Sequence, residues 1–234
     1  MKLGVMQPYI FPYIGYFQLI NAVDRFVVYD DVTFIKQGWI NRNRILLNGA
    51  AHIFTVPLKN ASSFVTIEKT EINKALYDPW RNKFMKTLGQ AYSKAPHYSM
   101  ASALIDNVLT AGHDTINSLA ADSIMQTCNY IGIKTSFIGT AAHYANNDLK
   151  AQERIIDICR KEEAQTYINA AGGRELYSKA DFEKAGLTLK FIKTHSITYP
   201  QSGNDFVPWL SIIDVMMFNT PDRILGFLKE CSFE

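Results

Sequence analysis

The sequence has 234 residues and a formal net charge of +2, and 47% of its residues are hydrophobic. The length suits one domain, or one domain with an added lobe, and the composition is typical of a globular protein. A net charge this close to zero argues against a nucleic-acid-binding protein. No apolar run reaches the roughly 18 residues that a membrane-spanning helix needs.

The N-terminal stretch and the cysteines lead us to expect a cytoplasmic protein. Pro8 and Pro12 interrupt the first apolar run, which is untypical of a secretory signal. Cys128, Cys159 and Cys231 are an odd number without a close pair, which argues against a disulfide framework and against a zinc site. We expect Cys128 and Cys159 to be small buried hydrophobes rather than nucleophiles.

The first 16 residues predict a strand, a stiff loop and the start of a helix. Leu3 to Met6 are apolar, Pro8, Pro12 and Gly15 break the run, and an apolar run resumes at Tyr16. In open α/β sheets ligands bind at the loops that leave the carboxyl ends of strands, and helix N-termini there attract anions. This stretch is therefore the first candidate for a binding site.

The following segments predict more strands. Residues 25–29 are strand-like and end at Asp30 and Asp31. Asn48-Gly49 between two strand-like runs predicts a hairpin over residues 44–57. Residues 64–72 alternate weakly, and we expect a further strand there.

The middle of the chain, from about residue 78 to residue 131, predicts helices. Asp78 is expected to cap the first helix with Pro79 at its first position, and large apolar residues then recur every four positions to Tyr92. Residues 99–109 and 115–131 predict two more helices, the last one ended by Gly132.

The final third alternates helices and strands. Helices are expected at 150–161 and 179–185, strands at 166–169 and 187–192, and further helices from Ser211 and Pro221. This alternation predicts an α/β fold with a mostly parallel, Rossmann-like sheet, flanking helices and a helical middle region. We expect one domain over residues 1–234.

Two polar clusters near the N-terminus are candidate binding segments. In the first, the stiff proline loop would present Gln7, Tyr13, Gly15 and Tyr16, unless this is simply a packed aromatic turn. The second is cationic and rich in amides, which suits a phosphate or carboxylate ligand, although a solvated hairpin face would have the same composition. Its candidate residues are Lys36, Trp39, Asn41, Arg42 and Arg44.

Two later clusters follow predicted strands. Asn169, Gly172 and Gly173 would offer backbone N–H groups to an anion, and a tight turn explains them equally well. Gln201 lies in a polar loop over residues 199–206. Asp214, inside the apolar helix that follows this loop, must be paired or neutral, and a partnered core residue is the favoured interpretation.

Candidate catalytic residues are few. Asp30 and His97 are the groups best placed for proton transfer, although a structural role is the usual one for such residues. The histidines have no metal-ligand spacing, so no metal site is expected. The sequence has no Gly-X-Ser-X-Gly motif, no P-loop and no Gly-X-Gly-X-X-Gly motif.

Five segments in order resemble the WbqC-like family: MQPYIFPYIGYFQLI, YDDVTFIKQGWINRNRI, FTVPLK with KAPHY, YINAAGGRELY and LSIIDVMMFN. The resemblance spans nearly the whole chain. Members of that family are often encoded with bacterial surface-polysaccharide (O-antigen) genes. Some have been proposed to transfer glycine or other aminoacyl groups to sugars.

The loop itself resembles, more weakly, the His-X-Gly-His segment of the HIGH nucleotidylyltransferase superfamily. The stretch at residues 13–16 is Tyr-Ile-Gly-Tyr, which keeps the glycine and replaces both histidines. Tyrosine carries no positive charge at neutral pH, which puts adenylyl transfer in doubt and still allows a nucleotide-like pocket. The resemblance implies a sheet of the HUP type.

The resemblances imply a transferase that joins an amino-acid or acyl group to a sugar or a nucleotide sugar. ATP is a candidate cofactor, and the small-molecule partner would be the sugar or nucleotide sugar. Catalysis would depend on positioning and on charge stabilisation. The alternative is a non-catalytic module that binds a nucleotide or sugar within a biosynthetic complex.

Overall fold

The computed structural model describes residues 1–203 and 205–234, and it confirms an α/β fold with a mostly parallel sheet. The strand order of the main sheet is β5-β2-β1-β6-β7-β8. All neighbours pair in parallel except β7 and β8. The strands are β1 (Lys2–Met6), β2 (Arg25–Val28), β5 (Ser136–Ile138), β6 (Thr166–Ala170), β7 (Thr188–Thr194) and β8 (Cys231–Phe233).

This order has a Rossmann-like character because the chain builds outward from β1 in both directions. The direction in which strands are added to the sheet reverses between β1 and β6. Ligands of open α/β sheets bind in the crevice outside the carboxyl ends of the two strands at such a reversal. The loop that leaves β1 therefore begins at the place where the topology favours a ligand.

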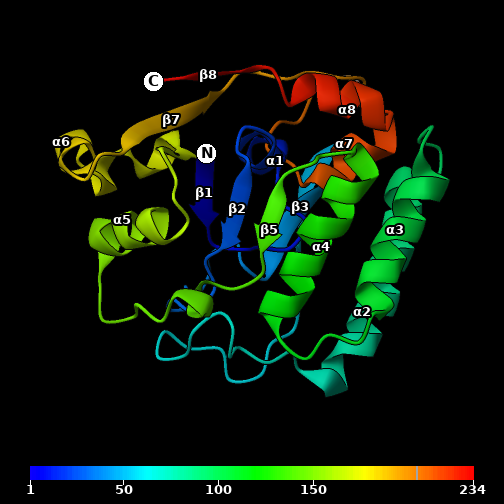
Figure 1. Cartoon of the computed structure of the whole chain (residues 1–234). Helices are drawn as coiled ribbons and strands as arrows, with labels where there is room; N and C mark the ends of the chain where they lie inside the picture. The colour runs from blue at the N-terminus through cyan, green and yellow to red at the C-terminus, as the bar shows by residue number, and fades with distance from the viewer. Residues whose placement is uncertain (204) are drawn as a thin grey trace.

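Helices cover both faces of the sheet (Figure 1). Leu3, Val5 and Val27 pack on one face against α5 (Ala151–Lys161) and α6 (Lys179–Lys184). Phe26 and Ile168 pack on the other face, in the larger cluster to which α1 (Ile14–Asn21) and the middle helices contribute. Alternate residues of one strand thus enter different clusters, as the period of a strand requires.

The helical region expected over residues 78–131 consists of α2 (Lys74–Tyr92), α3 (Tyr98–Thr110) and α4 (Ile116–Ile131). The side chain of Thr115 caps α4 by accepting a hydrogen bond from the backbone N–H of Ser118. Gly132 ends this helix at φ +89°, a conformation that glycine adopts without strain.

The predicted start of α2 was wrong. The helix begins at Lys74, so Asp78 is not its cap and Pro79 lies inside it. Pro79 has no N–H and so cannot donate to the carbonyl of Ala75, which is an exposed residue. Lys74 holds this first turn by an ion pair with Asp114 at 2.9 Å.

The strand expected at residues 64–72 is also wrong. The segment makes only isolated bridges, Thr33 with Thr66, Leu58 with Ile72, and Glu71 with Thr115. Its hydrogen bonds go to three different parts of the chain, so no ladder forms. The short edge strand β8 was not expected at all, because three residues give too little alternation to detect.

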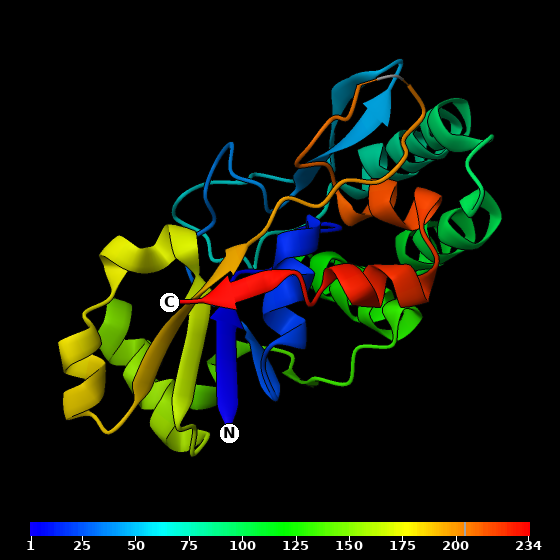
Figure 2. The same ribbon diagram turned by 90° about the horizontal axis from the view of Figure 1, so that it is seen from above.

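A two-stranded hairpin, β3 (Arg42–Leu47) and β4 (Ala50–Thr55), stands apart from the main sheet. Asn48 and Gly49 both have positive φ, which confirms the predicted Asn-Gly turn. Figure 2 shows the segment that leads from β7 to α7 (Ile212–Phe218) running beside this hairpin. The last helix, α8 (Pro221–Phe227), follows α7.

Asp214 of α7 joins these parts. Its carboxylate is fully buried and accepts hydrogen bonds from Tyr92 Oη at 2.9 Å, Tyr199 Oη at 2.7 Å and Gln201 Nε2 at 2.7 Å. Tyr92 Oη in turn accepts from the backbone N–H of Leu46 in β3. Burial raises the pKa of the Asp214 carboxyl, and its hydrogen bonds offset part of that rise. The expectation of a partnered core aspartate is confirmed.

Replacing Asp214 by alanine would leave three donors without their acceptor. Since each unsatisfied buried donor costs about 1–3 kcal/mol, we expect Asp214→Ala to lower the free energy of unfolding by about 3 kcal/mol or more, measured by urea denaturation. Asp106→Ala, at an exposed position of α3, is the control. Equal midpoints for the two variants would contradict this role of Asp214.

Candidate functional site

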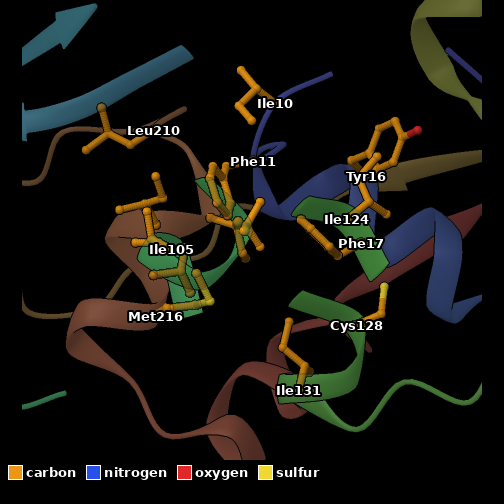
Figure 3. Packing of buried hydrophobic residues seen from close by; sticks show 14 of the residues in the cluster. Ile10, Phe11, Tyr16, Phe17, Ile105, Ile124, Cys128, Ile131, Leu210 and Met216 are labelled. Carbon is orange, nitrogen blue, oxygen red and sulfur yellow. The ribbon is translucent and has the colours of Figure 1, made fainter. Parts of the chain in front are cut away.

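The loop after β1 is held through the backbone of Phe11. Its N–H donates to Ser123 Oγ of α4 at 3.0 Å, and its carbonyl accepts from Asn43 Nδ2 and Ser211 Oγ, both at 2.7 Å. Phe11 adopts φ +40°, a strained value for a residue with a side chain. Figure 3 shows its ring in the same core cluster as Ile105 and Ile124.

Of the two tyrosines expected to line a pocket, Tyr16 lies in the core. It is 4% exposed, and its hydroxyl donates to the carbonyl of Gln7 at 3.0 Å. Tyr9 packs against Tyr16 edge to face, with ring centroids 5.3 Å apart. Burial raises the pKa of both phenols, so both stay neutral. Tyr16 therefore shapes the loop rather than contacting a ligand.

Tyr13 lies over Gly15, and this contact explains the glycine. A Cβ built on Gly15 would lie 2.5 Å from Cζ of Tyr13, too close for two carbon atoms. The ring of Tyr13 also lies 5.9 Å from that of Trp209. The absence of a side chain at Gly15 thus leaves room for the ring of Tyr13, which lies beside Trp209.

The cationic segment divides into residues with different surroundings. Arg42 donates to the carbonyls of Gln37 and Gly38 and so holds the turn before Trp39. Asn41 Nδ2 donates to the carbonyl of Val56 at 2.9 Å. Lys36 is exposed on the same turn. Arg42 and Asn41 therefore organise the hairpin and the turn before it.

Arg44 lies between two tryptophans. Its guanidinium carbon is 5.1 Å from the ring centroid of Trp39, and Nη2 donates to the carbonyl of Trp209 at 3.0 Å. Its Nε is buried and has no hydrogen-bond partner among the described residues. No carboxylate of residues 1–203 or 205–234 forms an ion pair with Arg44. A guanidinium without a counter-charge is suited to an anionic ligand.

These residues line what we call the aromatic cleft, a pocket of about 220 Å³. Its lining consists of Tyr9, Tyr13, Trp39, Asn43, Arg44 and Trp209. Trp39 and Trp209 are 44% and 62% exposed, unusually high for tryptophan, and Trp209 has φ +62°. Exposed aromatic rings and strained backbone are typical of ligand-binding positions.

Two further pockets adjoin the cleft. The Gln7 pocket, about 280 Å³, shares Tyr9 and Trp39 with it and is also lined by Gln7, Ile35 and Gly38. The distal pocket, about 250 Å³, shares Tyr13 and Trp209 with it and extends to residues 194–199 and Phe206. The three pockets therefore follow one another along the β1 loop, with the aromatic cleft in the middle.

Gln201 holds the loop that carries Trp209. Its amide donates to Asp214 and to the carbonyl of Val207, and it accepts from the N–H of Val207 at 2.8 Å. Both ends of this side chain are therefore used within the protein. The predicted polar cluster over residues 199–206 includes Asn204, which lies outside the described residues.

Asp30 and His97 do not line any of these three pockets. Asp30 is 1% exposed and accepts from Asn117 Nδ2, Thr140 Oγ1 and the N–H of Ala141. Burial raises the pKa of its carboxyl, and hydrogen bonds from Ala141 and Thr140 offset part of the rise. His97 precedes α3, and its N–H donates to the carbonyl of Met217.

The neighbouring Asp31 forms a buried ion pair with Arg154 of α5 at 2.5 Å. Arg154 also packs over the ring of Tyr29, 4.9 Å from its centroid. This cluster holds α5 against the carboxyl end of β2.

The glycine-rich segment follows β6 as a 3₁₀ helix, Ala171–Leu176. Asn169 is 6% exposed, and its Nδ2 would lie 2.7 Å from a Cβ built on Gly173. Gly173 therefore makes room for Asn169, whereas a Cβ on Gly172 would meet open space. This segment does not contribute to the three pockets.

Among the pocket-lining residues that were not predicted from the sequence are Trp209, His195 and Tyr9. Trp209 and His195 lie in a segment without periodicity, and their positions follow from contacts with the hairpin and with β8. Tyr9 lies in the proline loop, between the selected residues Gln7 and Tyr13. An unusual tryptophan after Pro208 was the available signal for Trp209.

No group of three or more His, Cys, Asp or Glu side chains among the described residues is arranged to hold a metal ion. Cys128 and Cys159 are buried, and burial raises the pKa of the Cys159 thiol to about 12, so both behave as small hydrophobes as expected. In the described part of the chain, a helix of the length and apolar character needed to cross a membrane does not occur.

The strand order and the cleft at the β1 loop place this chain in the class of Rossmann-like α/β proteins. The chain belongs to the WbqC-like protein family, whose model matches residues 7–225. It is 28% identical over 234 residues to the uncharacterized protein Rv1507c of Mycobacterium tuberculosis (strain ATCC 25618 / H37Rv), with 98% of each chain covered. No solved structure matches the chain significantly.

Gly15→Ala tests the contact between Gly15 and Tyr13. Alanine favours a helix over glycine by about 1 kcal/mol, so we expect the melting temperature to stay the same or to rise. The near-ultraviolet circular dichroism should change because Tyr13 must leave its position beside Trp209.

Gly226→Ala, in α8, is the matched control, because a Cβ there meets open space. It should leave the aromatic signal unchanged. A Gly15→Ala spectrum that superimposes on that of the unmodified protein would contradict the assigned role of Gly15.

Proposed function

We propose that this protein binds a nucleotide sugar in the aromatic cleft and acts as a transferase that joins an amino-acid or acyl group to the sugar. The observation that carries the proposal is Arg44, a guanidinium without an ion-pair partner among the described residues, in a pocket lined by two tryptophans and two tyrosines. An anion on the guanidinium and rings against the aromatic faces would satisfy both features.

The energetics favour a phosphate or carboxylate over a neutral ligand at this position. A hydrogen bond between a charged donor and an ionised acceptor contributes about 1.5–3 kcal/mol. Arg44 is half-buried, so the pocket around its guanidinium has a lower effective dielectric than bulk water, which strengthens the interaction with an anion. Such a ligand would gain tenfold or more in affinity from this one side chain.

The transfer reaction is proposed from the family resemblance. Surface-polysaccharide genes encode enzymes that make activated sugars and enzymes that modify these sugars. The modification that the resemblance implies is the addition of a glycyl or other acyl group. The preformed cleft would supply positioning and charge stabilisation. ATP is the candidate cofactor if the acyl group has to be activated first.

The second candidate is a non-catalytic module that binds the same nucleotide or sugar. It is favoured by a specific observation, namely that Asp30 and His97 lie outside the three pockets. Incubation with ATP, glycine and a panel of amino-sugar nucleotides distinguishes the two. A modified sugar supports the transferase, and binding without turnover across the panel supports the module.

Arg44→Gln tests the binding site itself. We expect this variant to bind the preferred nucleotide sugar about 10–100-fold more weakly, because it loses a charge-assisted hydrogen bond. Arg44→Lys should recover part of the affinity, since it restores the charge without the planar donor set. Isothermal titration calorimetry measures both.

Arg160→Gln, an exposed arginine of α5, is the matched control and should bind as the unmodified protein does. Equal affinities for Arg44→Gln and Arg160→Gln would show that the cleft does not hold the anion. The proposal would then be wrong.

A further inference from the structure

The three pockets differ in charge in a way that specifies the order of groups in their ligand. Arg44, in the aromatic cleft, is the one arginine or lysine among the described residues that line them, and no carboxylate lines any of the three. A ligand that fills all three would therefore have its negative charge in the middle and uncharged groups at both ends.

A nucleoside diphosphate sugar has this distribution of charge. We propose that its base occupies the distal pocket, its diphosphate contacts Arg44, and its sugar occupies the Gln7 pocket. This inference rests on the proposed function and adds the direction in which the ligand lies. It also assigns a base-binding role to the segment around Thr198, which sequence reasoning did not select.

The distal pocket has the lining that a nucleobase needs. Tyr13, Trp209, Tyr199 and Phe206 all line it, and the ring centroids of Tyr199 and Phe206 are 5.2 Å apart. Thr194, Ser196 and Thr198 also line this pocket, and a hydroxyl group is a side-chain group that can donate to or accept from the edge of a base.

The size of the distal pocket agrees with this occupant. A cavity of roughly 150 Å³ binds benzene, which has six heavy atoms. By that measure the distal pocket, at about 250 Å³, holds a group of about ten heavy atoms. A base of one or two rings is of this size.

The Gln7 pocket suits the sugar. The Gln7 amide can both donate to and accept from hydroxyl groups, and the indole of Trp39 offers a flat apolar surface to a sugar ring. Trp39 and Ile35 are 44% and 54% exposed, so a sugar here would remain accessible to a second substrate. A transferase needs that access, because the group it adds must reach the sugar.

The test measures dissociation constants by isothermal titration calorimetry for UDP, dTDP, ADP, GDP, inorganic pyrophosphate and glucose 1-phosphate. We expect at least one nucleoside diphosphate to bind about tenfold or more tightly than pyrophosphate, since stacking of a base contributes about 1–3 kcal/mol. Thr198→Trp, which fills the distal pocket, should remove this advantage and leave glucose 1-phosphate binding unchanged.

Gln7→Ala should do the reverse, weakening glucose 1-phosphate and sparing the nucleoside diphosphates. Thr188→Trp, at an exposed position of β7 outside the pockets, is the matched control for the added indole. If Thr198→Trp does not fold by circular dichroism, Phe206→Leu replaces it, because it removes an aromatic face and keeps an apolar side chain.

The outcomes separate this inference from the proposed function. The assignment of the base would be overturned if Thr198→Trp weakened glucose 1-phosphate and Gln7→Ala weakened the nucleoside diphosphates. It would also be overturned if the nucleoside diphosphates bound no better than pyrophosphate. In both cases Arg44 could still bind a phosphate, so the proposed function would stand. If none of the six probes binds the unmodified protein, the proposed function fails and the inference fails with it.

Discussion

Both polar groups of the Phe11 backbone are hydrogen-bonded by side chains from remote parts of the chain, and the candidate site depends on these bonds. Ser123 comes from α4, Asn43 from the hairpin and Ser211 from the start of α7. Because the bonds are buried, breaking one would leave a polar group without a partner at a cost of about 1–3 kcal/mol. They hold Phe11 at a positive φ that the residue would not adopt by itself.

This arrangement brings together parts of the protein that the sheet alone would not. The β1 loop provides Tyr9 and Tyr13, the hairpin provides Arg44, the turn before the hairpin provides Trp39, and the segment before α7 provides Trp209. The hairpin and the segment before α7 are also joined directly, since the carbonyl of Arg44 accepts a hydrogen bond from the N–H of Ser211 at 2.8 Å. A cleft fixed by buried bonds is formed before its ligand arrives, which reduces the entropic cost of binding.

The sequence predicted the features that local chemistry determines. The Asn48-Gly49 turn, the helix ending at Gly132 and a partnered Asp214 each follow from residues close in the chain or from the cost of burying a charge. Arg44 could not be distinguished from Lys36 because they differ only in their tertiary contacts: Arg44 contacts Trp39 and Trp209, whereas Lys36 is exposed. Trp209 was missed because its loop follows no periodic pattern. Hydrogen bonds to Asp214, such as that of Gln201, position this loop.

Hydrogen exchange at the Phe11 amide, measured by NMR in the ligand-free protein, tests the central claim most directly. If the loop is held as described, this amide should exchange as slowly as the amides of β1, through global or near-global unfolding. Fast exchange, at the rate of an exposed loop amide, would show that the loop is not held and that the cleft is not formed before a ligand binds.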